Sequence, residues 1–287
     1  MKNEKPWKLP HPARVLECIE KWRNLDLRKK EDSEIDTELS SFLDSLETFH
    51  VDRVHQNYSK LWRLRKFDYL IKNVSECWEP PAVNSIMGRC HAKGSSVLYV
   101  SKNLKTPFEE LSVQPDEQVY LIKYKQIKPL NLKRIVSEEF KITNTNGKPF
   151  YDDESMLSYQ ILREFVRSEF LKPIGNGTEY LYRISGSMCR VWFDDKDSDG
   201  WLYPSVQSPN DFNIAIKPES ARKKLEIEEV RIVQMVNKED VIKSGKIKDS
   251  ALPFFNMMKM VVESIFKSSI NDNQITWIPS SDLGGDF

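Results

Sequence analysis

The chain has 287 residues, of which 39% are hydrophobic and 30% are charged, with 10 glycines and 15 prolines. This length and composition allow one large or two small globular domains with a buried core, and they exclude a disordered chain. The 43 basic residues are balanced by 43 acidic residues. Nucleic acids and anionic membranes are bound through massed Lys and Arg, so neither is an expected partner.

The apolar runs of the sequence are short. Val97 to Val100 and Met257 to Val262 are among the longest, and both are far below the roughly 18 to 20 residues that cross a bilayer. The first residues, MKNEKPWKLPHPAR, contain no apolar segment of the kind found in secretory signals. We therefore expect a soluble, cytoplasmic protein.

Cysteine and histidine are sparse and scattered, which argues against a metal centre. No two cysteines form a C-x-x-C pair, and His50 and His55 are five residues apart, which is not a helical spacing that would direct both rings at one ion. We expect structural or incidental thiols at Cys18, Cys77, Cys90 and Cys189, no resident metal and no resident cofactor.

The first sixty residues predict an N-terminal helical extension, residues 1–60. Three series of apolar residues at helical spacing support it; they are Val15, Ile19 and Trp22 after Pro12, then Ile35, Leu39, Phe42 and Leu46, and finally Val51, Val54, Tyr58 and Leu61. Charges of both signs between Arg28 and Asp36 indicate a solvated connection. Because apolar stripes do not remain in water, we expect these helices to pack on the rest of the protein and to wall one side of its cleft.

A change of period marks the start of the next region. Trp62 and Leu64 alternate with Arg63 and Arg65, which predicts a strand with one apolar face and two guanidinium groups on the other. Guanidinium groups bind phosphate oxygens through paired donors, so Arg63, Arg65 and Arg89 are candidates for a diphosphate. Surface ion pairing is the alternative for each of them.

Further strands and helices follow without a regular βαβ repeat, and no P-loop or GxGxxG is present. Strands are expected at Val97–Val100, Val119–Tyr124, Gly200–Tyr203, Asn213–Ile216 and Val230–Val233, and helices at Glu154–Phe170 and Leu252–Phe266. The fold class is therefore mixed α+β rather than doubly wound. We expect a catalytic domain at 61–235 and a C-terminal helical segment and tail at 236–287.

Thr106, Pro107 and Glu109 match a capping box, with Thr at the N-cap, Pro at the first helical position and Glu three residues after the Thr. Glu110 lies about 100° further round the helix and is left available for chemistry, although acids at a helix N-terminus can simply favour the macrodipole. Ser205 follows a strand that Pro204 interrupts, so its hydroxyl lies at a strand end, and no GxSxG surrounds it.

These residues follow one another in an order that resembles the RES domain, a family named for its Arg, Glu and Ser. The six matching pieces are WRLR at 62–65, GRCH at 88–91 with Gly94, LY at 98–99, TPFEE at 106–110, DGWLYPS at 199–205 and NIAIKP at 213–218. They span about Leu61 to Pro218, over half of the chain. His91 stands where the family has Asn, and Pro107 stands where it has a small residue.

The resemblance implies an ADP-ribosyltransferase-like fold, and its characterised members are toxins that consume NAD or transfer ADP-ribose. Cleavage at nicotinamide needs no acid, since the leaving group is neutral, and the ribose develops oxocarbenium character that a carboxylate stabilises. The expected catalytic residues are Arg63 at the diphosphate, Tyr99 near the nicotinamide or its ribose, Glu110 at the developing cation and Ser205 at a ribose or amide group. Expected substrate-binding residues are Arg65, Arg89, His91 and Tyr203.

The expected function is an NAD-consuming, toxin-like enzyme that works by phosphorolysis or hydrolysis. One alternative is a mono-ADP-ribosyltransferase acting on a macromolecule, and a second is an inactive RES-like interaction scaffold. NAD is expected as substrate rather than cofactor. Inorganic phosphate, an antitoxin or other protein inhibitor, and a second copy of the chain are partners that the sequence leaves open, as it leaves open whether the nucleophile is phosphate, water or a target side chain.

Overall fold

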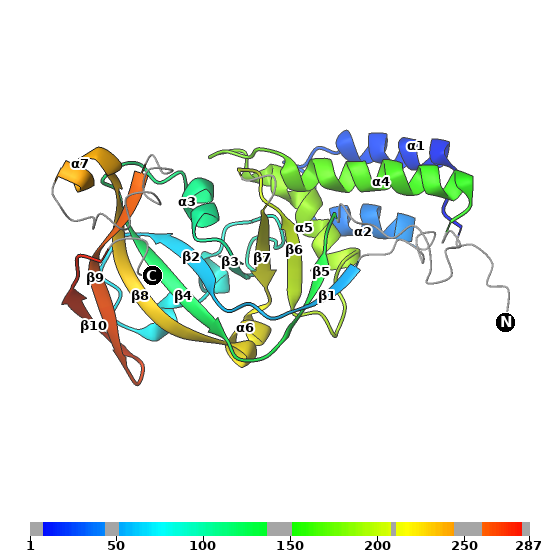
Figure 1. The fold of residues 1–287 in the computed structure, drawn as a ribbon. Coiled ribbons are helices and arrows are strands. Elements are labelled where there is room, and N and C mark those ends of the chain that lie inside the picture. Colours follow the sequence, from blue (N-terminus) through cyan, green and yellow to red (C-terminus); the bar gives the residue numbers. More distant parts are fainter. Residues whose placement is uncertain (1–7, 44–51, 137–150, 208–210, 244–259, 283–287) are drawn as a thin grey trace. The chain divides into compact units, whose positions relative to one another are not determined.

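A computed structural model describes residues 8–43, 52–136, 151–207, 211–243 and 260–282. Ten strands, seven α-helices and three short 3-10 helices lie in these residues (Figure 1), so the expected α+β class is confirmed. The chain divides into two compact units. Unit 1 contains residues 1–56, 80–98 and 130–221, and unit 2 contains residues 57–79, 99–129 and 222–287. The predicted boundaries after residues 60 and 235 differ from this division.

Four helices form the helical part of unit 1: α1 (Pro12–Arg23), α2 (Asp32–Leu43), α4 (Asp153–Leu171) and α5 (Tyr182–Val191). Pro12 is at the start of α1, where its missing N–H costs no hydrogen bond. Asp152 caps α4 by accepting a hydrogen bond from Ser155 N at 2.8 Å. The helices expected at Val15–Trp22, at Ile35–Phe42 and at Glu154–Phe170 are therefore confirmed, while Leu46 lies outside the described residues.

The N-terminal helices pack on α4 and α5 (Figure 1). Trp22 is 2% exposed, and its ring lies 5.5 Å from Phe165 and 5.4 Å from Trp192 between ring centroids. Arg190 on α5 forms an ion pair of 2.7 Å with Asp36 on α2. The expectation that these helices dock on the rest of the protein is confirmed within unit 1. The solvated connection expected up to Asp36 is shorter, because α2 begins at Asp32.

Replacing Trp22 by Ala is expected to lower the free energy of unfolding by about 3 to 5 kcal/mol, because it removes a buried ring from three aromatic neighbours. Chemical denaturation of the two proteins measures the difference. Leu16→Ala is the matched control, since Leu16 is on the same helix and 52% exposed. A Trp22→Ala protein that is no less stable than Leu16→Ala would contradict this packing.

The sheet of unit 1 is mixed. Its strands, in spatial order, are β1 (Asp52–Gln56), β5 (Leu130–Arg134), β6 (Gly200–Pro204) and β7 (Phe212–Ile216). β1 is antiparallel to β5, β5 is parallel to β6, and β6 is antiparallel to β7. The helix expected from Val51 to Leu61 is wrong, because residues 52–56 pair with β5 as a strand. The strands expected at Gly200–Tyr203 and Asn213–Ile216 are confirmed.

The sheet of unit 2 is antiparallel throughout. Its strands, in spatial order, are β3 (Leu98–Ser101), β2 (Leu61–Lys66), β4 (Gln118–Gln126), β8 (Leu225–Asn237), β9 (Met260–Asn271) and β10 (Gln274–Pro279). The helix expected at Leu252–Phe266 is wrong from residue 260 onward, where β9 begins; residues 252–259 lie outside the described residues. The expected strands near Val97, Val119 and Val230 are confirmed.

Short elements complete the fold. They are α3 (Lys105–Leu111), α6 (Pro218–Lys224), α7 (Lys238–Lys243) and the 3-10 helices Val74–Cys77, Ala82–Asn84 and Glu179–Leu181. In its described residues, 236–243 and 260–282, the C-terminal segment contains a short helix and a β-hairpin, whereas helix was expected there. None of the described helices has the length and apolar character needed to span a membrane.

Candidate active site

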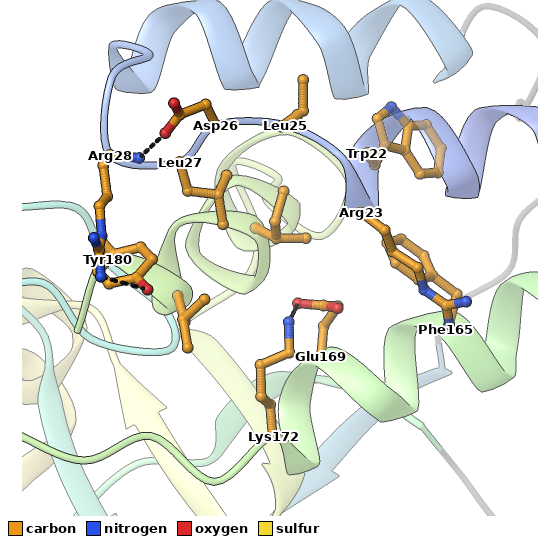
Figure 2. A pocket seen from close by; sticks show the side chains of 12 residues that line it. Trp22, Arg23, Leu25, Asp26, Leu27, Arg28, Phe165, Glu169, Lys172 and Tyr180 are labelled. Carbon is orange, nitrogen blue, oxygen red and sulfur yellow. Dashed lines mark hydrogen bonds and ion pairs between the residues drawn. The ribbon is translucent and has the colours of Figure 1, made fainter. Parts of the chain in front are cut away.

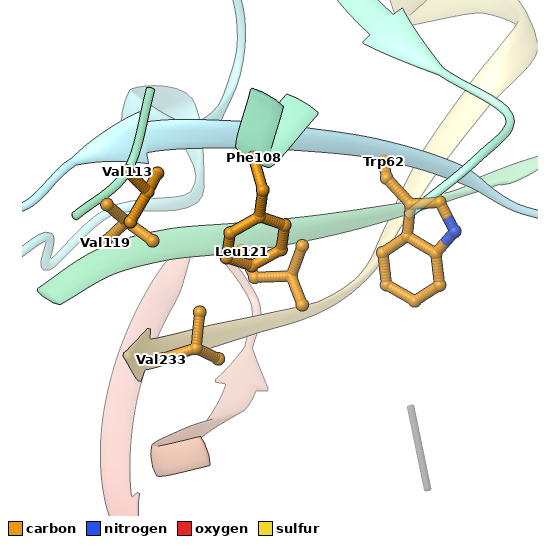
Figure 3. Close-up of a cluster of buried hydrophobic side chains, with 6 residues drawn as sticks. All are labelled: Trp62, Phe108, Val113, Val119, Leu121 and Val233. Atoms are coloured by element: carbon orange, nitrogen blue, oxygen red, sulfur yellow. The ribbon is translucent and has the colours of Figure 1, made fainter. Parts of the chain in front are cut away.

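The two faces of strand β2 have different environments. Trp62 and Leu64 point to the face where the buried cluster of unit 2 lies, made of Trp62, Phe108, Val113, Val119, Leu121 and Val233 (Figure 3). Arg63 and Arg65 alternate with them and pair across the sheet with Ile122 and Tyr120 of β4. The prediction that the two guanidinium groups share one face of a strand is therefore confirmed.

Both arginines hold the backbone of residues 76–78. Arg63 Nη1 donates to the carbonyl oxygen of Trp78 and lies 3.5 Å from that of Cys77. Arg65 donates to Glu76 O at 2.8 Å and to the Tyr69 hydroxyl at 2.7 Å. The geometry therefore assigns the arginines a positioning role on this segment, in addition to the phosphate contact predicted for them.

Arg63→Ala is expected to lower the free energy of unfolding by roughly 1.5 to 3 kcal/mol, because it removes a charged donor from a partly buried carbonyl. Chemical denaturation is the measurement. Lys66→Ala, at an exposed position of the same strand, is the control and should change stability by no more than about 0.5 kcal/mol. Equal stability of the two variants would show that Arg63 does not hold residues 77 and 78.

Tyrosines of β4 and a C-terminal tryptophan bond carbonyls of residues 69–77, on and before the same segment. Tyr124 donates to Cys77 O, Tyr120 donates to Tyr69 O at 2.7 Å, and Trp277 Nε1 donates to Ile71 O at 2.9 Å.

Burial raises the pKa of the Cys77 thiol to about 12, with a smaller opposing effect of Arg63. This cysteine is therefore a protonated thiol at neutral pH and not a nucleophile. Sequence reasoning missed Tyr120, Tyr124 and Trp277 as hydrogen-bond donors. The spacing of the two tyrosines along β4 does place them on the sheet face that carries Arg63 and Arg65.

Glu79 is a further acidic residue on this segment that sequence reasoning missed. Its Oε1 pairs with Arg222 at 2.7 Å, and the Arg222 guanidinium lies 4.7 Å from the centre of the Trp78 ring. Its Oε2 is buried and has no hydrogen-bond partner among the described residues. A buried carboxylate oxygen in this state is a ready acceptor, so Glu79 joins the candidate site. Nothing in the local sequence distinguishes it from a surface acid.

Helix α3 carries Glu110 and begins two residues earlier than expected. Leu104 is at the N-cap and Lys105 is the first helical residue, so the predicted capping box is wrong. Thr106 is fully buried instead, and Glu109 forms an ion pair of 2.8 Å with Lys105 one turn earlier. Burial of the apolar side of α3 against β2 outweighs the local preference for a threonine cap.

Glu110 is exposed, two residues from the buried Phe108 that anchors α3 to the sheet (Figure 3). Two residues correspond to about 200° of helix rotation, so the carboxylate is directed away from the cluster. Because α3 packs on the Trp62 face, β2 separates α3 from the Arg63 and Arg65 contacts with residues 76–78. The structure therefore does not bring these guanidinium groups together with Glu110 on one face of β2. Tyr99 is half-buried on β3, whose Ser101 pairs with Trp62.

In unit 1, Arg89 holds the end of α4. Its guanidinium donates to Lys172 O at 2.7 Å and to Glu169 O at 3.4 Å, and it lies 5.1 Å from the centre of the Tyr182 ring. These carbonyls are among those that a helix leaves unpaired at its C-terminus, where a cation is also favoured by the dipole. Arg89 is 9% exposed, so most of its surface is used in this cap rather than offered to a ligand.

His91 is at the end of the loop that begins at Gly88 and carries Arg89, and it is 8% exposed. Gly88 and His91 exchange backbone hydrogen bonds of 3.1 and 3.4 Å. The ring Nε2 lies 2.8 Å from Ile86 O, which can only accept, so this nitrogen carries a proton. Burial, assisted by the charge of Arg190, lowers the pKa of His91 from its ordinary value of 6.5.

His91→Asn, which restores the RES-family residue, is expected to reduce acid sensitivity. Because the His91 pKa is lowered in the folded state, the unfolded chain binds more protons below pH 6.5. Stability is therefore lost as the pH falls through that value. The decrease in melting temperature between pH 7.5 and 5.5 should be smaller in His91→Asn than in the parent. His55→Asn, at an exposed site, should keep the parental decrease; an unchanged decrease in His91→Asn would refute the assignment.

Tyr203 and Ser205 lie at the end of β6, as expected. Ser205 is fully buried, and its N–H donates to Asp211 O at 2.9 Å. The Tyr203 ring lies 5.9 Å from that of Phe170 on α4. These two residues belong to unit 1 together with Arg89 and His91, whereas Tyr99, Glu110 and the arginines of β2 belong to unit 2. A cleft that combines residues of both sets stays a prediction.

A family comparison covers most of these residues. A model of the RES domain matches residues 60–236, which is more than half of the chain. No curated protein sequence matches the chain significantly. The RES domain is associated with NAD-related toxin activity. The match includes all six signature pieces from WRLR to NIAIKP, and the chain therefore belongs to the RES-domain family.

Proposed function

We propose that this protein consumes NAD by cleaving the bond between nicotinamide and ribose, with phosphate or water as the acceptor. The observation that carries the proposal is the RES match over residues 60–236, in which the Arg, Tyr, Glu and Ser of the signature are all present as Arg63, Tyr99, Glu110 and Ser205. Their retention disfavours an inactive scaffold, which has no need of the reactive carboxylate.

The proposed chemistry is a substitution at the ribose carbon that bears nicotinamide. Neutral nicotinamide leaves with the bonding electron pair, and the ribose acquires oxocarbenium character, as in glycoside cleavage. Glu110 provides a negative charge that stabilises this cation. Tyr99 packs against the nicotinamide or its ribose, and Ser205 hydrogen-bonds a ribose or amide group. Phosphate or water then forms the new bond to the same carbon; water loses a proton in doing so.

The arginines are proposed to act at the diphosphate end through position as well as charge. Arg63 and Arg65 order residues 76–78, and Arg89 orders the end of α4. Glu79 follows the ordered segment and supplies a carboxylate oxygen with no hydrogen-bond partner among the described residues, which suits a ribose hydroxyl donor. His91 shapes its loop, and Tyr203 packs the end of β6 against α4, by the contacts described above.

The test is to incubate the purified full chain with NAD, with and without inorganic phosphate, and to identify the products by mass spectrometry. Nicotinamide with ADP-ribose phosphate would establish phosphorolysis, and nicotinamide with ADP-ribose would establish hydrolysis. Release of nicotinamide only when a macromolecular acceptor is added would overturn the proposal in favour of ADP-ribosyl transfer. Intact NAD under all conditions would favour an inactive scaffold.

A further inference from the structure

Unit 1 contains a pocket of about 360 Å³ that none of the signature residues lines (Figure 2). One wall is the connection from α1 to α2, which precedes the matched RES region. The opposite walls are α4 and the residues around Tyr180 at the start of α5. The volume is within the range of small-ligand pockets, roughly 300 to 1,000 Å³.

Two arginines at this pocket are set against aromatic rings. The Arg28 guanidinium lies 4.5 Å from the centre of the Tyr180 ring and donates to its hydroxyl at 3.1 Å. The Arg23 guanidinium lies 5.7 Å from the centre of the Phe165 ring. Such stacking restricts a flexible side chain while leaving the edge of the guanidinium able to donate. Figure 2 shows the two pairs on either side of Glu169 and Lys172.

The charges that line the pocket are unevenly compensated. Glu169 is paired with Lys172 at 2.6 Å, and Asp26 is paired with Lys29 at 3.1 Å. Arg23 and Arg28 form no ion pair with any residue that the structure describes. The charges of Glu169 and Asp26 are therefore balanced by the two lysines. Arg23 and Arg28 give the pocket a net positive potential.

We propose that this pocket binds a small aromatic anion, with a planar ring among the apolar and aromatic side chains of the lining and a carboxylate or phosphate in the positive field of Arg23 and Arg28. An anion completes the charge balance of the lining, and a flat ring matches its aromatic walls. The pocket is connected to the Gly88–His91 loop of the RES signature. Arg89 in that loop donates hydrogen bonds to the peptide carbonyls of Glu169 and Lys172, two residues that line the pocket.

The test is isothermal titration of the purified full chain with indole-3-acetate and with adenosine 5′-monophosphate, which present the ring with a carboxylate or with a phosphate. Their neutral analogues, indole-3-acetamide and adenosine, are titrated in parallel. We expect at least one anion to bind with a Kd about tenfold or more below that of its neutral analogue. The anion that binds identifies the acidic group that the pocket accepts.

Variants locate the binding site. Arg23→Gln and Arg28→Gln should each raise the Kd about tenfold or more, whereas Arg14→Gln, which removes one exposed charge from α1, should leave it unchanged. Arg28→Gln should not alter NAD turnover, so failure of this proposal and failure of the proposed enzyme activity are read separately. Absence of binding by both anions, equal binding of the neutral analogues, or an unchanged Kd in both pocket variants would overturn the inference.

Discussion

Replacing Glu110 by Gln is expected to lower the rate of nicotinamide release on the order of a hundred- to a thousandfold while the protein stays folded. In the proposed reaction the carboxylate acts on a positive charge that exists mainly in the transition state, so its loss should lower kcat far more than it raises KM. Folding is preserved because Glu110 is exposed and the burial of Thr106 and Phe108 fixes α3. Initial rates over a range of NAD concentrations, together with circular dichroism, measure both effects.

Glu109→Gln is the matched control for this experiment. It removes the same charge from the neighbouring position of α3, where the carboxylate is engaged with Lys105. We expect it to retain activity within a few-fold of the parent, since a surface ion pair contributes only about 0.2 to 1 kcal/mol. Parental turnover in Glu110→Gln, or an equal loss in Glu109→Gln, would remove Glu110 from the catalytic role.

Gly200→Ala is expected to prevent folding of unit 1. Gly200 begins β6 with φ of +157°, and a Cβ at this position would lie 2.0 Å from Ala215 O and 2.9 Å from the Cα of Ile216. Both atoms are backbone of the paired strand β7, so no side-chain rotation relieves the overlap. The free energy of unfolding should fall by more than about 4 kcal/mol, which is exceptional for a single substitution. The effect should appear as insoluble protein or a greatly lowered melting temperature.

Gly175→Ala serves as the control for Gly200→Ala. A Cβ at Gly175 would meet no atom within 4 Å, so this variant should be as soluble as the parent and change stability by no more than about 0.5 kcal/mol. A soluble Gly200→Ala protein with a parental melting temperature would show that β6 and β7 are not paired in the register found here.

The parts of the fold that sequence reasoning predicted are those whose burial follows a simple period. Trp62 and Leu64 alternate with arginines, and the strand at β2 was predicted with its faces correct. The segment near Val54 was mistaken for a helix because its pairing with β5, more than seventy residues later, decides its conformation. In β9 a register shift near Ser264 interrupts the alternation of buried and exposed residues. The sequence of this segment therefore lacks the period-two pattern that would have predicted a strand.

The candidate site was predicted in its residue types rather than in its contacts. The signature letters identify Arg63, Arg89 and Glu110, but they do not show that the arginines bind backbone carbonyls of Trp78 and Lys172. A carbonyl has no sequence signature, since every residue carries one. The position of a helix start is similarly open to tertiary packing, which is why Thr106 was assigned to a cap and is instead fully buried.

The interleaved division of the chain limits the order in which the protein can fold during synthesis. The chain passes between the two units five times, and neither unit is a continuous segment. Strand β4 obtains its partner β8 only after about a hundred further residues have been made, and unit 1 is incomplete until residue 221 has left the ribosome. Native structure, and any activity that depends on it, is therefore expected only after the segments that complete both units have been synthesised. The folded protein should then form in one step rather than unit by unit.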